Sequence, residues 1–195
     1  MVDTNKVKFG IKSCYYSVIT EAADGTITYG TPVAFPGAVS LSLDPEGGDP
    51  EPFYADDIIY YQSPGTNSGY SGDFEVAKVP DSFRTDVLGE VTDDNGMLVE
   101  DADATSKAFA LIAQFSGDKH NTRHVWYNCT ASRPSSGSAT IEDSASPQTE
   151  SITITAISAT FGDRHIVKAK ATPDNTTAYN AFFTAVQVPT FTSEG

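Results

Sequence analysis

Apolar residues recur along this chain in short runs with a period of two, which is the pattern of strands that bury one face. Residues 38–43 and residues 151–159 show this alternation most clearly. The apolar members of these two runs, which we expect to face the core, are Val39, Leu41, Leu43, Ile152, Ile154, Ala156 and Ile157. Long segments with a period of 3.6 are absent, so the pattern favours a mainly β domain.

Further strands are predicted where aromatic and β-branched residues cluster between turn signals. These segments are residues 7–20, 26–29, 58–62, 97–99, 108–116, 122–132 and 165–171, the last as a hairpin partner of the strand before it. Residues 24–25 and 93–96 carry the Asp-Gly and Asp-Asp-Asn-Gly signals of tight turns. Residues 178–188 fit either a short helix or a closing strand.

Residues 69–89 combine a strand, a turn and a short helix, and they form the segment around which the chain is organised. Gly72 indicates a bulge or a close backbone approach within the strand, and Pro80 ends it. Asp81 or Ser82 is then the expected N-cap of a helix over residues 81–88. A helix this short must pack against a sheet to be stable. The apolar side chains available for that packing are Phe83, Val87 and Leu88, and Gly89 follows as a left-handed C-terminal residue.

Residues 44–57 read as a long loop between strands, because they contain three prolines, two glycines and six acids. Loops of this length in compact domains are usually functional or become ordered against a partner. Phe53 and Tyr54 either fold back on the domain or anchor another subunit. The resulting candidate contact residues are Asp44, Pro45, Glu46, Asp49, Glu51, Phe53, Tyr54, Asp56 and Asp57.

The charge distribution is strongly asymmetric. The formal net charge is −14, and no Lys or Arg lies between Lys12 and Lys78, while that interval carries ten acids. This balance argues against a protein that grips nucleic acid, because phosphate binding requires clustered basic residues. It predicts one strongly negative surface, which either confers solubility or faces something that must not adhere to it.

Candidate chemistry is sparse. The sequence has no nucleophile elbow, phosphate loop, HExxH or CxxC motif, and no cofactor is expected. His120 and His124 are four residues apart on a turn and a strand, where that offset separates two metal ligands too widely. Cys14 and Cys129 are expected as free, partly buried thiols, because no export signal precedes them. We therefore expect a protein that is not an enzyme.

The length suits one domain, residues 1–195, and the longest apolar run is too short to cross a membrane. Synthesis in a cytoplasm is the expectation that follows.

Several motifs, taken in order, carry a resemblance over residues 6–186. They are GYSGDFEVAKVPDSFRTDVLG at residues 69–89, DNGMLVE at 94–100, FAL at 109–111 and PQTESITITA at 147–156. Together they resemble the major tail protein, or tail tube protein, of long-tailed, non-contractile bacteriophages of Gram-positive bacteria. The resemblance implies a β-sandwich or barrel with one small flanking helix and a long inter-strand loop.

The resemblance also implies a structural role in the virion tail, with assembly in the host cytoplasm. Six copies would form a ring, and stacked rings would form the conduit for DNA ejection. The implied partners are the chain itself and the tape-measure, tail terminator and distal tail proteins, while DNA passes without specific binding. The alternative from another class is a virion-decorating or surface β-sandwich that binds carbohydrate or protein.

Overall fold

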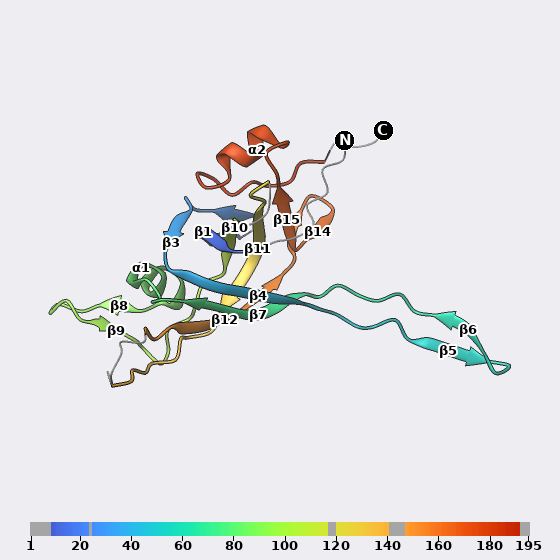
Figure 1. Ribbon diagram of the computed structural model, residues 1–195, viewed down its shortest axis with the longest axis horizontal. Helices are drawn as coiled ribbons and strands as arrows, with labels where there is room; N and C mark the ends of the chain where they lie inside the picture. The colour runs from blue at the N-terminus through green and yellow to red at the C-terminus, as the bar shows by residue number, and fades with distance from the viewer. Residues whose placement is uncertain (1–8, 24, 117–119, 141–146, 192–195) are drawn as a thin grey trace.

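The computed structural model describes residues 9–23, 25–116, 120–140 and 147–191, and its body is a nine-stranded antiparallel sheet (Figure 1). The strands are β1 (Ile11–Glu21), β2 (Ile27–Tyr29), β3 (Val33–Phe35), β4 (Ala38–Glu46), β7 (Gly69–Val76), β10 (Phe109–Phe115), β11 (Arg123–Ala131), β12 (Glu150–Ile157) and β15 (Lys168–Ala171). Their order is β2-β1-β10-β11-β12-β7-β4, with β3 also paired to β1 and β15 to β11. The mainly β class expected from the sequence is confirmed.

Three two-stranded ladders lie outside this sheet. They are β5 (Pro52–Ala55) with β6 (Ile58–Gln62), β8 (Val91–Thr92) with β9 (Leu98–Val99), and β13 (Ala159–Phe161) with β14 (Arg164–Ile166). The strand predicted over residues 165–171 forms as two strands, with a break at Val167. β14 pairs with β13 as the expected hairpin partner, whereas β15 pairs with β11.

The main core lies on the inner face of the sheet and is closed by the predicted helix. Residues 81–88 form α1 (Asp81–Phe83) followed by a π-helical turn, η1 (Arg84–Leu88), and Gly89 has the expected left-handed φ of 79°. Phe83 is fully buried, with its ring centre 5.0 Å from that of Tyr16 and 5.3 Å from that of Phe109. The N-cap prediction was wrong, because Pro80 occupies that position and no side chain caps the helix.

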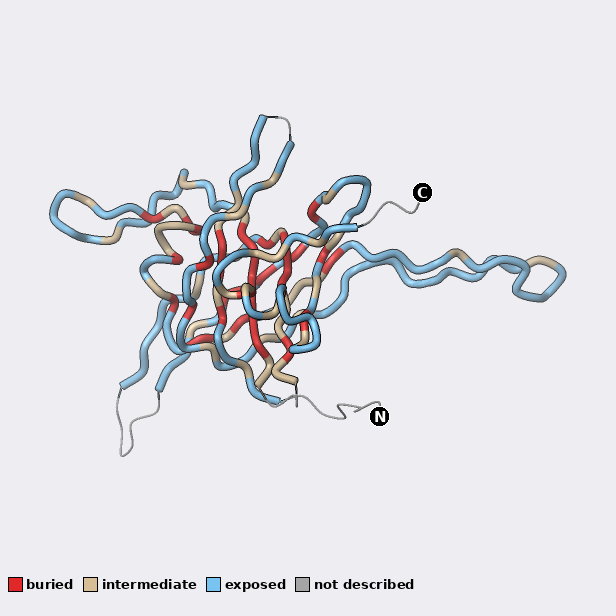
Figure 2. The backbone as a smooth tube through the Cα atoms, turned by 90° about the horizontal axis from the view of Figure 1, so that it is seen from above, coloured by how far each residue is buried: buried red, intermediate tan, exposed pale blue. Residues whose placement is uncertain are grey.

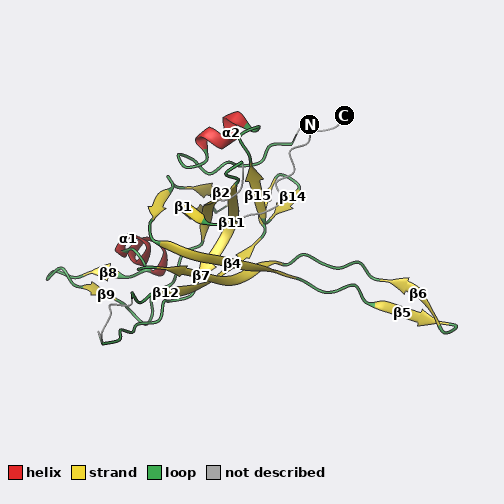
Figure 3. Ribbon diagram, viewed as in Figure 1, coloured by secondary structure: helices red, strands yellow, loops and turns green. Residues whose placement is uncertain are grey.

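A second apolar cluster covers the opposite face of β10 and β11. It contains Ile112, Val125 and Tyr127 from the sheet and Phe182 from the C-terminal segment. Residues 178–188, which the pattern left undecided, contain the end of α2 (Thr176–Ala181) and no strand. Figure 3 shows the two helices on different sides of the strands. Because both faces of β10 are covered, its first six residues are all buried.

Two core assignments were wrong, and a register shift explains one of them. Val39 is 48% exposed, because the pairing of β4 with β7 shifts between Ala38 and Ser40 and turns Val39 away from the core. Ile157 is also 48% exposed, since the alternation that buries Ile154 and Ala156 points its neighbour outward. The other alternating residues face the core as expected, with Leu41 and Leu43 packed at its margin.

The close backbone approach expected at Gly72 is confirmed. A Cβ at Gly72 would lie 1.9 Å from the carbonyl oxygen of Ser42 on β4. A side chain larger than hydrogen is therefore excluded at position 72, where β4 and β7 approach closely. Cys14 and Cys129 are confirmed as free thiols, and both are fully rather than partly buried.

Candidate assembly surfaces

The prediction that residues 44–57 form a loop was wrong, because this segment is the outgoing half of a long β-hairpin. Its first residues extend β4 to Glu46, and its later residues form β5, which pairs with β6. We call residues 47–68 the hairpin arm. Figures 1 and 2 show the arm projecting from the body as a thin double strand, in views turned by 90°.

Backbone hydrogen bonds continue from the sheet into the arm. Ser68 N donates to the carbonyl oxygen of Glu46 at 2.8 Å, and Thr66 N donates to that of Gly48 at 2.9 Å. Further out, Ser63 N donates to Glu51 at 2.9 Å. The arm is therefore a direct extension of β4 and β7, and its direction is set by the main sheet.

The tip of the arm is a two-residue turn. Asp56 and Asp57 have φ values of 51° and 61°, and they connect the paired residues Ala55 and Ile58. Positive φ at both central residues is the requirement of a hairpin turn that matches strand twist. Asp tolerates this conformation better than most residues do.

Large apolar side chains on the arm lie in water. Phe53 and Tyr54 are each 61% exposed, so they do not fold back on the domain. Four more large apolar residues share the arm, and Tyr60 is the most exposed of them at 72%. These four are Ile58, Ile59, Tyr60 and Tyr61, which lie outside the contact residues predicted from the sequence. Concentrated apolar exposure of this kind marks an interaction site.

The acidic candidates follow the same hairpin. Asp44, Pro45 and Glu46 lie at the end of β4, whereas the remaining candidates lie on the arm. The arm carries four acids and no Lys, Arg or His. It therefore combines exposed aromatic rings with uncompensated negative charge.

A second distinctive surface is the outer face of β4, β7 and β12. Small hydroxyl residues alternate there with carboxylates, and the exposed or half-exposed members are Ser40, Ser42, Asp44, Ser71, Asp73, Glu75, Ser151, Thr153 and Thr155. We call this set the polar face. It contains no basic side chain.

Hydrogen bonds hold the carboxylates of the polar face in place. Thr153 Oγ1 donates to Asp73 at 3.0 Å. Glu75 accepts from Ser40 Oγ at 3.1 Å and from Thr149 Oγ1 at 2.6 Å. These donors are neutral hydroxyls, so they orient the carboxylates without cancelling their charge. The result is a negative surface whose carboxylates are held in fixed positions.

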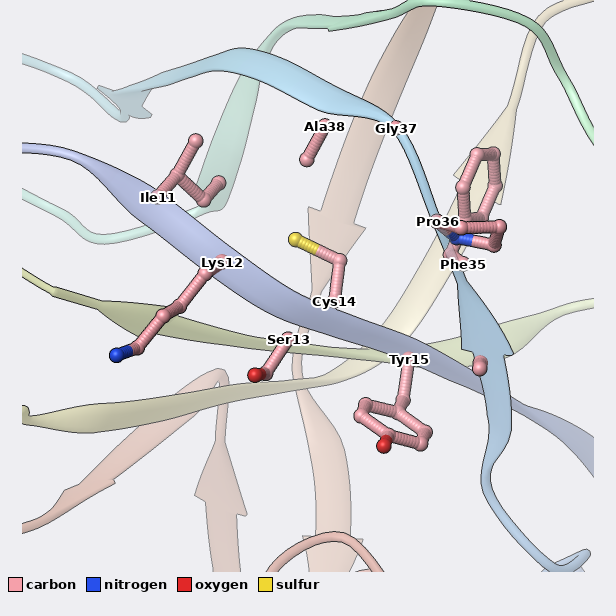
Figure 4. A pocket seen from close by; sticks show the side chains of 10 residues that line it. Ile11, Lys12, Ser13, Cys14, Tyr15, Phe35, Pro36, Gly37 and Ala38 are labelled. Carbon is pink, nitrogen blue, oxygen red and sulfur yellow. The ribbon is translucent and has the colours of Figure 1, made fainter.

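A pocket of about 360 Å³ lies between β1 and the segment from β3 to β4 (Figure 4). It opens where Ser13 has a φ of 53° and the pairing of β1 with β10 is irregular. Figure 4 shows the Cys14 side chain directed toward Ala38, with Lys12 directed away. Burial raises the pKa of the Cys14 thiol to about 12, so it stays protonated and is a poor nucleophile near neutral pH.

The described residues hold no group of three or more His, Cys, Asp or Glu side chains arranged for a metal ion. In the same part of the chain, no helix has the length and apolar character needed to span a membrane. The surfaces that distinguish this molecule are therefore the hairpin arm and the polar face.

Comparison with known families agrees with this description. The family model described as "Phage tail tube protein" matches residues 1–181, which is most of the chain. The chain belongs to the phage tail tube protein family. No curated protein matches it. Tail tube proteins are structural and typically non-enzymatic, and they assemble with themselves and other tail components in the virion tail.

Proposed function

We propose that the chain is the subunit of a tail tube in which six copies form a ring and stacked rings enclose the path of the DNA. Family membership and the exposed hairpin arm support this proposal together. A ring closes through head-to-tail contacts, and a second contact surface propagates rings into an open filament. The arm supplies such a second surface, because it reaches beyond the body of its own subunit (Figure 1).

The observation that carries the proposal is the apolar exposure of the arm. An aromatic side chain buries about 150–250 Å² when covered, and each Å² contributes about 25 cal/mol. Phe53, Tyr54, Tyr60 and Tyr61 are each exposed by 59% or more. Covering them in an assembly would therefore contribute several kcal/mol per subunit, to which the neighbouring isoleucines would add.

The proposed contact residues are those predicted from the sequence between Asp44 and Asp57, together with the four apolar residues of β6. The predicted residues at the end of β4 and along β5 form the outgoing half of the hairpin, and β6 forms the returning half. A neighbouring ring is the proposed partner of both halves.

The polar face is the proposed wall of the bore. Its carboxylates repel DNA phosphates within about 8–10 Å at physiological salt, so the genome slides past without binding. Asp73 and Glu75 accept hydrogen bonds from hydroxyl groups, which bring no positive charge to the wall. The segment between Lys12 and Lys78 has no Lys or Arg, so it contributes no positive charge that would bind DNA phosphates on such a wall.

Truncation of the arm tests the proposed function. Gly48 and Thr66 face each other through a backbone hydrogen bond, so residues 49–65 can be replaced by an Asn-Gly turn without changing the register of β4 and β7. The shortened subunit should fold with an unchanged melting temperature and form no tubes in negative-stain electron microscopy. Normal tubes from this variant would refute the role of the arm.

The ring number and the bore are tested on the same tubes. Mass per length and rotational symmetry from cryo-electron microscopy should give six copies per ring, with the polar face inward. A virion-decorating or binding protein would instead remain monomeric at concentrations where the wild type forms tubes.

A further inference from the structure

One short segment near the end of the chain is basic and lies entirely within the described residues. Residues 164–170 carry Arg164, His165, Lys168 and Lys170 and no acid, although the formal net charge of the protein is −14. All four side chains are exposed. The other exposed basic residues of the described chain, such as Lys12, Lys78 and Lys107, are scattered singly. Local solubility does not require a basic cluster on a strongly acidic protein.

The geometry of β15 presents two of these cations side by side. Lys168 lies opposite Trp126 and Lys170 lies opposite His124 on β11, so both lysines point to one face of the sheet. Within the described residues, the other edge of β15 has no strand partner. The two ammonium groups are therefore carried on an accessible sheet edge.

Aromatic rings accompany the cations. Lys168 Nζ lies 4.0 Å from the ring centre of Tyr70, the second residue of β7 after the arm. The Arg164 guanidinium lies 4.2 Å from the ring centre of Phe191, which is 47% exposed. Among the described residues, no carboxylate forms a salt bridge with Arg164, Lys168 or Lys170. The segment thus offers positive charge together with apolar contact area.

We propose that Arg164, Lys168 and Lys170 form the docking surface for the hairpin arm of another copy of this chain. This inference rests on the proposed function. The arm has four acids and no base, and the described chain contains no salt bridge to those acids. Charge and apolar character are therefore complementary between two different surfaces of the same molecule. A head-to-tail contact between unlike surfaces closes into a ring or propagates as an open filament, according to its rotation, and in the proposed tube this contact would connect one ring to the next.

The expected energetics are those of exposed ion pairs. Each pair contributes about 0.2–1 kcal/mol, and the attraction weakens with added salt. Charge complementarity also directs the encounter and excludes wrong orientations, because an arm placed against the polar face would meet like charge. The aromatic side chains of the arm would supply most of the affinity, and the basic segment would determine where the arm binds.

Charge reversal and rescue in the full-length chain test the proposal. Lys170→Glu reverses one charge at a residue outside the cation–ring contacts, and it should raise the critical concentration for assembly about threefold to tenfold in light scattering. Combining it with Glu51→Lys on the arm should restore the wild-type value to within about twofold. Lys78→Glu is the matched control, because it makes the same charge change at an exposed lysine beyond the end of β7 opposite the arm.

The outcomes separate this proposal from the function on which it depends. If Lys170→Glu assembles like the Lys78→Glu control, or if Glu51→Lys does not rescue it, the docking surface is wrong while the tube function stands. If the wild type forms neither rings nor tubes, or if the arm truncation assembles normally, the proposed function itself is wrong. Should Lys170→Glu lower the melting temperature, Arg164→Glu with the same rescue provides the deciding comparison.

Discussion

Replacing Phe53 by Ser should separate assembly from folding. Phe53 lies opposite Tyr61 across β5 and β6, and its side chain is 61% exposed. An aromatic side chain buries about 150–250 Å² in all, so covering the exposed part in an assembly removes about 90–150 Å² from water. At about 25 cal/mol per Å², the change costs the assembled state about 3 kcal/mol per subunit.

The isolated subunit should lose far less. Its only local loss is a cross-strand aromatic pair worth about 0.2–1 kcal/mol, on an arm outside the core. Exposed substitutions change the free energy of unfolding by about 0.5 kcal/mol or less, which is below about 2 °C in melting temperature for a chain of this size. The critical concentration for assembly should rise about 100-fold, because 1.4 kcal/mol corresponds to a factor of ten.

Light scattering against protein concentration measures the first effect, and a thermal melt below the critical concentration measures the second. Phe53→Leu is the matched control, because it keeps most of the apolar area and should assemble within about tenfold of the wild type. Tubes from Phe53→Ser at the wild-type critical concentration would refute the reasoning. So would a fall in melting temperature large enough to explain the loss of assembly by unfolding.

Three further predictions concern the body of the subunit. Burial raises the pKa of both Cys14 and Cys129 from 9.0 to about 12. The folded state should therefore lose stability as the pH rises from 9 toward 12, because the thiols ionise more readily in the unfolded chain. Urea denaturation should show a loss of about 2–3 kcal/mol per thiol at pH 11. Gly72→Val should lower the melting temperature by several degrees, because its Cβ would meet a backbone oxygen at 1.9 Å. Asp73→Lys should leave tube formation intact but make the tubes retain DNA in a co-sedimentation assay at low salt, whereas binding equal to the wild type would remove the polar face from the bore.

The body of the fold could be predicted from the sequence because its signals are local. The alternation in β12 and the six buried residues of β10 follow directly from apolar pattern, and the strand of β7 with the helix after it follows from apolar spacing and turn chemistry. Val39 was misplaced because a bulge changes the register of β4 by one residue, which a pattern with a period of two does not record. Ile157 was misplaced although the regular alternation of β12 points it outward, because its apolar character was given more weight than its position.

The hairpin arm was misread because prolines usually interrupt strands. Glu46 accepts a backbone hydrogen bond from Ser68, so the nitrogen of the preceding Pro45 faces away from β7, at the free edge of the sheet. Pro52 follows Glu51, which accepts from Ser63, and it is placed in the same way. Each proline therefore removes a donor that has no partner in this hairpin. The sequence shows the prolines but cannot show which edge they face.

Strand pairing and acidic residues in the arm explain how a subunit with so much exposed apolar surface can remain soluble before assembly. The two halves of the arm pair with each other, so the backbone donors that face inward are satisfied within the subunit, and Pro52 removes one of the donors that would face outward. Acids at Asp49, Glu51 and the Asp56–Asp57 turn flank the aromatic rings and repel a second arm of equal charge. Arm-to-arm contact is thereby disfavoured, whereas contact with a basic, ring-bearing surface is not. In the proposed assembly, the negative charge of the arm therefore has two effects, because it repels the arm of another free subunit and attracts the basic segment at residues 164–170 of a neighbouring copy.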